Sequence, residues 1–214
     1  AVLRRDIAAA VATGVDQITF NPLMPPLVRG GERGPALEPD LGRADDLYRV
    51  IDEELNGRGW RSVTSWCYAA GAGTRAEYLV DSPEYLAAGC GAVGYYDGGF
   101  HHNTFNLRRY GELLAEDRTA VVRRRAAAPW EREAYLLLGF LFGGGGSTTV
   151  LRRRLGAAPS RRVRLAGAFW RLLGLNGSRP WDVGPRGRRL VNAMMQRFFG
   201  AQTRLRARAL AADL

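Results

Sequence analysis

The sequence contains no lysine, only two cysteines and only two histidines. Cys67 and Cys90 are too few and too far apart for a zinc or iron–sulfur site, which needs at least three grouped ligands. No apolar run approaches the roughly 18 residues that a membrane span requires, and the first segment, AVLRRDIAAAVATG, is too polar for a secretory signal. We therefore expect a cytoplasmic protein that has no membrane span and no metal site of its own.

The positive charge of the chain is carried entirely by arginine. All 31 basic residues are Arg, and with 21 acidic residues the net charge is +10. Such a charge can mark a surface that binds nucleic acid or another polyanion. It can also follow from GC-rich coding DNA, which favours Arg, Ala and Gly, and then the arginines form a solvated surface. We favour the second interpretation and keep the polyanion site as the alternative.

Hydrophobic patterning predicts helices that alternate with short apolar strands from residue 1 to residue 117. Residues 2–13 form an Ala-rich helical stretch that stops at Gly14, and Ala44 to Leu55 carries apolar residues at helical spacing. Strands are predicted for VDQITF after Gly14, for RSVTSWCYA after the second helix, and for Leu86 to Ala88, with a surface loop from Val28 to Gly42. This alternation predicts an α/β fold with a parallel sheet and right-handed crossovers.

Residues 126–214 have a different, mostly helical character and are predicted to form a second domain. Helices are expected at Glu131 to Phe142, Thr148 to Leu155, Ser160 to Leu175 and Arg188 to Phe199, with Ser160 as an N-cap. The segment GLNGSRPWDVGPRGRRL predicts a strand, a turn and a strand before the last helix. Three helices and such a β-wing resemble a winged-helix module.

The segment from Tyr85 to Asn103, YLAAGCGAVGYYDGGFHHN, is rich in glycine. Because glycine has no Cβ, Gly89, Gly91 and Gly94 tolerate positive φ and let a flat ligand lie against the backbone. The alternative is a tight connection that binds no ligand, since a glycine motif alone is a weak signal. A short helix, TFNLRRYGELLAED, is predicted to follow.

The run from Glu77 to Leu114 resembles the radical SAM family of oxygen-independent coproporphyrinogen III oxidases. In that family a strand of the form LGLGPGAHSY, a G-x-x-N element and a short helix that ends in Tyr follow one another. Here they correspond to Leu86 to Tyr95, Gly99 to Asn103, and Tyr110. The segments VDQITFNPLM and VGPRGRRLVNAMMQRFFG resemble the family's strand with a Y-P-L-like turn and its closing helix, so the resemblance covers nearly the whole chain.

The resemblance implies the last βα units of a partial TIM-like radical SAM barrel over residues 1–117, followed by a winged-helix-like domain over residues 126–214. It also implies two cofactors, S-adenosylmethionine and a 4Fe–4S cluster. In the family the cluster reduces S-adenosylmethionine, which yields a 5′-deoxyadenosyl radical. The family holds this cluster with a C-x-x-x-C-x-x-C loop, and the chain has no such motif. We therefore expect a C-terminal fragment of a radical SAM oxidoreductase, whose cluster lies in the missing N-terminal part and which is inactive alone.

The resemblance assigns S-adenosylmethionine contacts to Pro22, Gly89, Gly91 and Val93, with Pro22 and Val93 as apolar walls. The same residues can also be ordinary parts of the fold. His101 and His102 are interpreted as solvated loop histidines, or alternatively as groups that contact an acidic substrate such as a propionate. They are not expected to share a metal ion, because adjacent residues of an extended segment point to opposite sides.

The implied partners are a small-molecule substrate, such as a porphyrinogen, and an electron donor such as flavodoxin or ferredoxin. The family also contains heme chaperones and radical SAM methylases or cyclopropanases, which remain alternatives, so the substrate cannot be predicted. The apolar residues of the last helix are expected in the core rather than against a porphyrin: Met194, Met195, Phe198 and Phe199.

A rival hypothesis treats the second domain as a winged-helix module that binds nucleic acid. Its arginines would then neutralise phosphates: Arg152 to Arg154, Arg161, Arg162, Arg164, Arg186, Arg188 and Arg189. The helix that would enter a groove carries Leu165, Phe169 and Trp170, as well as Leu172 and Leu173, and is therefore predicted to belong to a core. This argument favours the enzyme over the nucleic-acid module.

Overall fold

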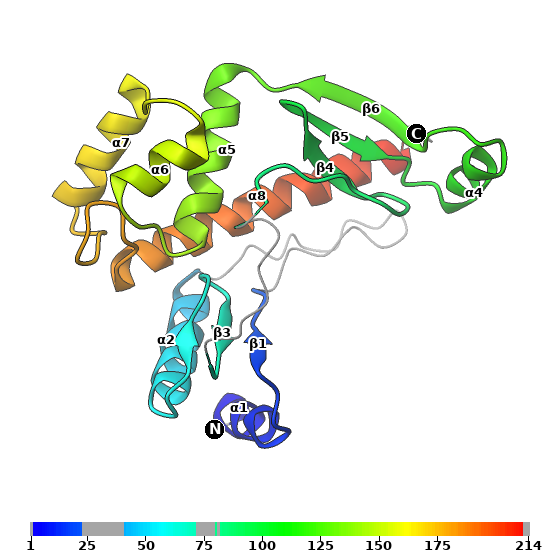
Figure 1. Cartoon of the computed structure of the whole chain (residues 1–214). Helices are drawn as coiled ribbons and strands as arrows, with labels where there is room; N and C mark the ends of the chain where they lie inside the picture. Colours follow the sequence, from blue (N-terminus) through cyan, green and yellow to red (C-terminus); the bar gives the residue numbers. More distant parts are fainter. Residues whose placement is uncertain (1, 23–40, 72–79, 81, 212–214) are drawn as a thin grey trace.

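The computed structural model of the protein describes residues 2–22, 41–71, 80 and 82–211 (Figure 1). Figure 1 shows helices α5 to α7 at one end of the upper part and a small sheet, with helix α4, at the other. The first elements of the chain form a separate group below them. Most of the predicted surface loop, residues 28–40, lies outside the described residues.

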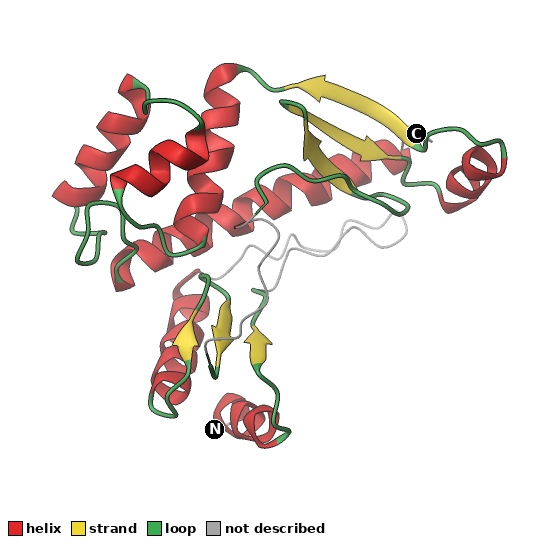
Figure 2. Cartoon of the chain, in the orientation of Figure 1, coloured by secondary structure: helices red, strands yellow, loops and turns green. Residues whose placement is uncertain are grey.

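The N-terminal group contains two helices and one three-stranded sheet (Figure 2). Its elements are α1 (Val2–Ala12), β1 (Gln17–Thr19), α2 (Leu41–Asn56), β2 (Arg61–Ser62) and β3 (Cys67–Ala69). The strand order is β1-β3-β2, and both pairings are antiparallel. The two helices and the first strand confirm the predicted elements, although the single strand expected at RSVTSWCYA is a hairpin.

The second sheet consists of β4 (Val93–Tyr96), β5 (Gly99–Asn103) and β6 (Val121–Ala126), in this order and again antiparallel. The predicted short helix is confirmed as α4 (Leu107–Ala115), whose N-cap Asn106 accepts a hydrogen bond from the backbone of Arg109. The residues that close the β4–β5 hairpin, Asp97 and Gly98, both have positive φ, which suits a tight two-residue turn.

The prediction of a parallel sheet is wrong for the described strands, because every pairing among them is antiparallel. The two hairpins have tight connections, whereas a parallel pair needs a crossover of a dozen or more residues. Leu86 to Ala88 do not form the predicted buried strand: only Tyr85 makes an isolated bridge, to Tyr95, and Leu86 is 73% exposed. The fold is mixed α and β, and the barrel remains a proposal.

The described residues from 129 to 211 contain four helices: α5 (Pro129–Phe142), α6 (Thr148–Leu155), α7 (Arg161–Leu172) and α8 (Pro185–Ala211). Ser147 and Ser160 cap α6 and α7, since each hydroxyl accepts a backbone N–H three residues later. The strand–turn–strand predicted before α8 is wrong, because this segment forms no regular strands and contains one isolated bridge, between Asn176 and Val183. The predicted β-wing is therefore reduced to this bridge.

Most of the buried apolar residues form one hydrophobic cluster that includes residues from Ile7 in α1 to Met195 in α8. Trp66, in the β2–β3 turn, packs edge-on against Phe142 with ring centroids 5.1 Å apart, and its indole N–H donates to Asn192 Oδ1 at 3.0 Å. Asp52 of α2 accepts the hydroxyl of Tyr68 at 2.6 Å and also pairs with Arg188 of α8. These contacts join residues on both sides of the predicted domain boundary, and the division into two domains remains a prediction.

Helix α7 differs from its predicted role, because only part of its apolar surface is buried. Val163 and Trp170 face the core, whereas Leu165, Phe169 and Leu172 are 51%, 60% and 79% exposed. The expectation that this helix is committed to the core is therefore wrong for its outer face. In α8, Met195 is buried as predicted and Met194 is 38% exposed. None of the helices in the described ranges is both long and apolar enough to cross a membrane.

Candidate functional site

The structure gathers most of the predicted site residues at one end of the β4–β5 hairpin. Val93 pairs with His102, and the next pair along the ladder is Gly94 with His101. Gly89 and Gly91, both with positive φ, lie in the loop that leads into β4. Pro22 is also buried, but it belongs to a different part of the chain, the segment that follows strand β1 of the N-terminal sheet. Cofactor binding by these residues remains a prediction.

The glycine loop is held by two residues that the G-x-x-N element and the short helix contribute. The side-chain amide of Asn103 donates to the carbonyl oxygens of Ala87, at 3.2 Å, and Gly89, at 2.8 Å. The N–H of Gly89 donates to the hydroxyl of Tyr110 at 3.2 Å. Asn103 is buried. The two side chains therefore satisfy both polar backbone groups of Gly89.

Close packing explains the need for glycine at two of the three positions. A Cβ on Gly91 would lie 2.6 Å from Cδ1 of Phe105, and a Cβ on Gly94 would lie 2.4 Å from Cε1 of His101. These glycines therefore face side chains of the protein itself. At Gly89, in contrast, a Cβ would meet nothing within 4 Å. Only Gly89 has open space where the sequence predicted that a ligand could approach the backbone.

The two histidines are buried, with exposed fractions of 7% for His101 and 5% for His102. The interpretation as solvated loop histidines is therefore wrong. The N–H of Ala87 points at Nε2 of His101 at 3.5 Å, and His102 Nδ1 lies 3.2 Å from the carbonyl oxygen of Asn103. Burial lowers the pKa of His101, and the nearby Arg124 and His102 lower it further. The fold therefore favours the neutral form of His101.

The lowered pKa of His101 predicts a specific dependence of stability on pH. Because the fold favours the neutral imidazole, its contribution is complete above the unfolded pKa of 6.5 and is lost as the pH falls below that value. We expect the free energy of unfolding of the wild type to fall more steeply between pH 7 and pH 5 than that of His101→Gln, by up to about 1.4 kcal/mol per pH unit. Urea titrations at several pH values measure both slopes, and equal slopes would contradict the prediction.

The cysteines do not form a metal site. Cys67 is buried in β3, and the thiol of Cys90 donates to the carbonyl oxygen of Thr104 at 3.3 Å. Over residues 2–22, 41–71, 80 and 82–211, no three His, Cys, Asp or Glu side chains are grouped so that they could hold a metal ion.

Sequence reasoning missed an aromatic cluster behind the hairpin. Tyr95 of β4 is 1% exposed and packs against Phe100 and Tyr135, with ring centroids 4.8 and 4.6 Å away. Tyr135 in turn contacts Phe198 of α8 at 6.4 Å. Tyr95 and Phe100 stand at matching distances on either side of the Asp97-Gly98 turn, and this placement was a signal for their pairing. The cluster attaches the sheet that carries the site to α5 and α8.

The fold that carries this glycine loop, hairpin and short helix is similar to that of one solved structure. The structure is similar to coproporphyrinogen III oxidase from Escherichia coli, which is described as a radical SAM enzyme. The TM-score is 0.52 at 15% sequence identity, and the match covers 76% of this chain and 41% of that chain. No family model matches the sequence, and no curated protein matches it.

Proposed function

We propose that this chain forms part of a radical SAM oxidoreductase of the oxygen-independent coproporphyrinogen III oxidase type. The observation that carries the proposal is a combination of the fold match with the order of the sequence motifs. The glycine loop, the β4–β5 hairpin and α4 stand in the order of the matched motifs, in a chain whose fold is similar to that enzyme. The strand is nevertheless confined to Val93–Tyr96, and Tyr110 lies in the first half of α4 rather than at its end.

S-adenosylmethionine is compatible with the residues around the loop. Gly89 leaves open space beside the backbone and Val93 is half-buried, so Val93 can supply apolar surface to a nucleoside, and a contact from Pro22 belongs to the proposal. When bound, the cofactor would supply the radical chemistry of such enzymes. The chain itself would orient it, because Asn103 and Tyr110 fix the backbone of the loop.

A 4Fe–4S cluster does not fit the residues of this chain, which has only two cysteines, Cys67 and Cys90. The two thiols also do not lie together in one ligand loop. Cys67 is buried in β3, and the thiol of Cys90 donates to the carbonyl oxygen of Thr104. We propose that the cluster thiolates lie outside this chain and that the chain alone is inactive. A porphyrinogen substrate, an external electron donor and a cytoplasmic location belong to the same proposal.

The nucleic-acid alternative receives no support from α7, the helix that would enter a groove. Its exposed residues include arginines, but three large apolar side chains, Leu165, Phe169 and Leu172, lie exposed among them. Helices that read a groove present polar donors and acceptors to the base edges.

Binding of S-adenosylhomocysteine, which needs no cluster, tests the cofactor proposal. We expect saturable binding by isothermal titration calorimetry, and we expect Val93→Asp to weaken it by roughly 2–3 kcal/mol, about a hundredfold, because a carboxylate would be placed against the nucleoside. Val122→Asp, on an exposed position of β6, is the matched control and should change affinity little. Absence of binding at millimolar ligand, or equal affinity of the two variants, would rule out this site.

A further inference from the structure

A groove lies between the start of α5 and the connection from α6 to α7, at the turn end of the β4–β5 hairpin. We call it the α5–α7 groove. Its volume is about 670 Å³, within the roughly 300–1,000 Å³ of small-molecule sites. Gly98, in the β4–β5 turn, lines one end of it. The candidate cofactor residues Val93 and His102 lie at the other end of the same two strands, so the groove is a different place.

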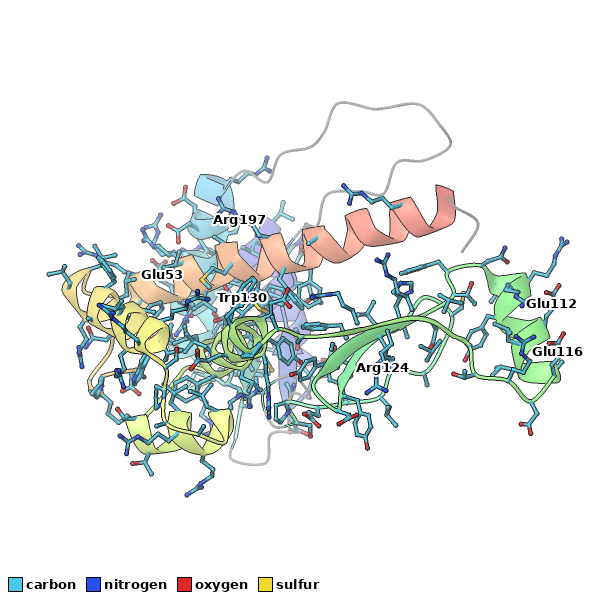
Figure 3. All side chains as sticks on the ribbon, turned by 90° about the horizontal axis from the view of Figure 1, so that it is seen from above. Glu53, Glu112, Glu116, Arg124, Trp130 and Arg197 are labelled. Carbon is cyan, nitrogen blue, oxygen red and sulfur yellow. The ribbon has the colours of Figure 1, made fainter. Side chains whose placement is uncertain are left out.

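The walls of the groove are mainly apolar. Leu136 of α5 and Leu155 of α6 line it and are themselves buried. Ala157 and Ala158 line it from the α6–α7 connection. Trp130, in the first turn of α5, also lines the groove and is 55% exposed, so its ring is available to a flat ligand. Figure 3 labels Trp130 beside α5, far from the acidic residues of α4.

Three arginines line the groove: Arg132, Arg161 and Arg162. In the described part of the chain no carboxylate forms an ion pair with any of them. The acidic lining residue, Glu133, is bonded within the wall of the groove, because its carboxylate accepts hydrogen bonds from the N–H and the hydroxyl of Ser160, another lining residue. The groove therefore combines three guanidinium groups with one carboxylate whose oxygens are already bonded.

The helices on both sides add to the positive potential. α5 and α7 both begin at the groove, so the positive ends of two helix dipoles point toward it, and Glu131 in the first turn of α5 and Glu133 at the N-cap of α7 offset part of this potential. α7 carries Arg161 and Arg162 in its first turn, where a positive charge is unfavourable for a helix, and the Glu133 carboxylate is bonded to its N-cap, Ser160. An anion bound in the groove would place a second negative charge beside these two arginines.

We propose that the α5–α7 groove binds an organic anion with a flat, apolar body, such as an aromatic carboxylate. The carboxylate pairs with the guanidinium groups of Arg161 and Arg162, whose fork geometry suits it. The body of the ligand lies against Trp130 and the leucine side chains. The inference rests on the contacts of the groove and not on the proposed function.

The test compares 2-naphthoate with the neutral 2-naphthamide by isothermal titration calorimetry at low salt on the unchanged protein. We expect 2-naphthoate to bind saturably with one site per chain and the amide to bind at least about tenfold more weakly, because only the carboxylate can form charged pairs with arginine. Absence of saturable binding of 2-naphthoate at 1 mM, or equal affinity for both compounds, overturns the proposal.

Matched variants locate the site. Arg161→Glu with Arg162→Glu should weaken 2-naphthoate binding at least about tenfold, whereas Arg152→Glu with Arg153→Glu, the same change of charge outside the groove, should change it less than about twofold. Trp130→Ala should weaken it about fivefold, and Phe169→Ala, equally exposed but outside the groove, should not. Equal effects within either pair would show unspecific attraction and overturn the proposal.

Discussion

Replacing Gly145 by alanine is expected to destabilise the protein by roughly 3 kcal/mol. Gly145 has a φ of +75°, and a Cβ there would lie 1.8 Å from the backbone oxygen of Trp181. The left-handed backbone costs an alanine about 1 kcal/mol or more, and the overlap forces the chain around Trp181 to move, which typically costs a further 1–3 kcal/mol. Urea denaturation of the variant and the wild type measures the difference.

The neighbouring Gly144 provides the control for this prediction. Its φ of +87° imposes a similar backbone strain, but a Cβ there would meet nothing within 4 Å. Gly144→Ala should therefore cost only about 1 kcal/mol. If the two alanine variants lose the same stability, the contact between Gly145 and Trp181 does not limit the size of the residue.

The helices were predictable because their signals are local. Ser147 and Ser160 stand where N-caps are expected, and Gly156 ends α6 in the left-handed conformation. The glycine run after α5 was recognisable as a helix end. Its tight approach to Trp181 was not, because the two segments are 36 residues apart in the sequence and only the packed fold brings them together.

The strands were predicted less well, because strand pairing depends on partners that are distant in the sequence. The alternation of helices and apolar runs suggested a parallel sheet, although Asp97-Gly98 between Tyr96 and Gly99 is a strong local signal for an antiparallel hairpin. β6 was missed because its middle consists of three arginines, so it lacks the apolar alternation of a strand. Its place in the sheet comes from backbone pairing with β5.

At the candidate site the sequence predicted the unusual backbone but not what it faces. Positive φ at Gly89 and Gly91 follows from the composition of the loop. That Phe105 occupies the space beside Gly91, and that His101 occupies the space beside Gly94, depends on the pairing of β4 with β5. The hydrogen bonds from the Asn103 side chain to the carbonyl oxygens of Ala87 and Gly89 could be inferred only from the order of the motifs, since a buried amide gives no pattern in the sequence.

The contact of the N-terminal sheet with the C-terminal helices depends strongly on Trp66. Its side chain is 5% exposed, packs against Phe142 and Phe199, and donates to Asn192. The backbone N–H of the preceding Ser65 donates to the carbonyl oxygen of Phe142 at 2.9 Å. The β2–β3 turn is therefore held by the end of α5 and the middle of α8.

Trp66→Ala is expected to lower the free energy of unfolding by roughly 4 kcal/mol, because it leaves a cavity against two aromatic rings. It also removes the hydrogen-bond donor from the buried Asn192. Trp66→Phe should cost less, since it retains most of the ring packing and loses the N–H donor. Trp130→Ala, at an exposed position, is the control and should cost under about 1 kcal/mol.

Hydrogen exchange on the Trp66→Ala variant decides how the two parts of the chain are coupled. If the shared cluster from Ile7 to Met195 unfolds as one unit, amides of α5 and α8 should lose protection by about as much as those of β3. If the predicted domains at residues 1–117 and 126–214 are independent, the loss should be confined to the first. Loss of protection in β3 alone, with α5 and α8 unchanged, would contradict the coupling through Trp66 and favour two separately stable domains.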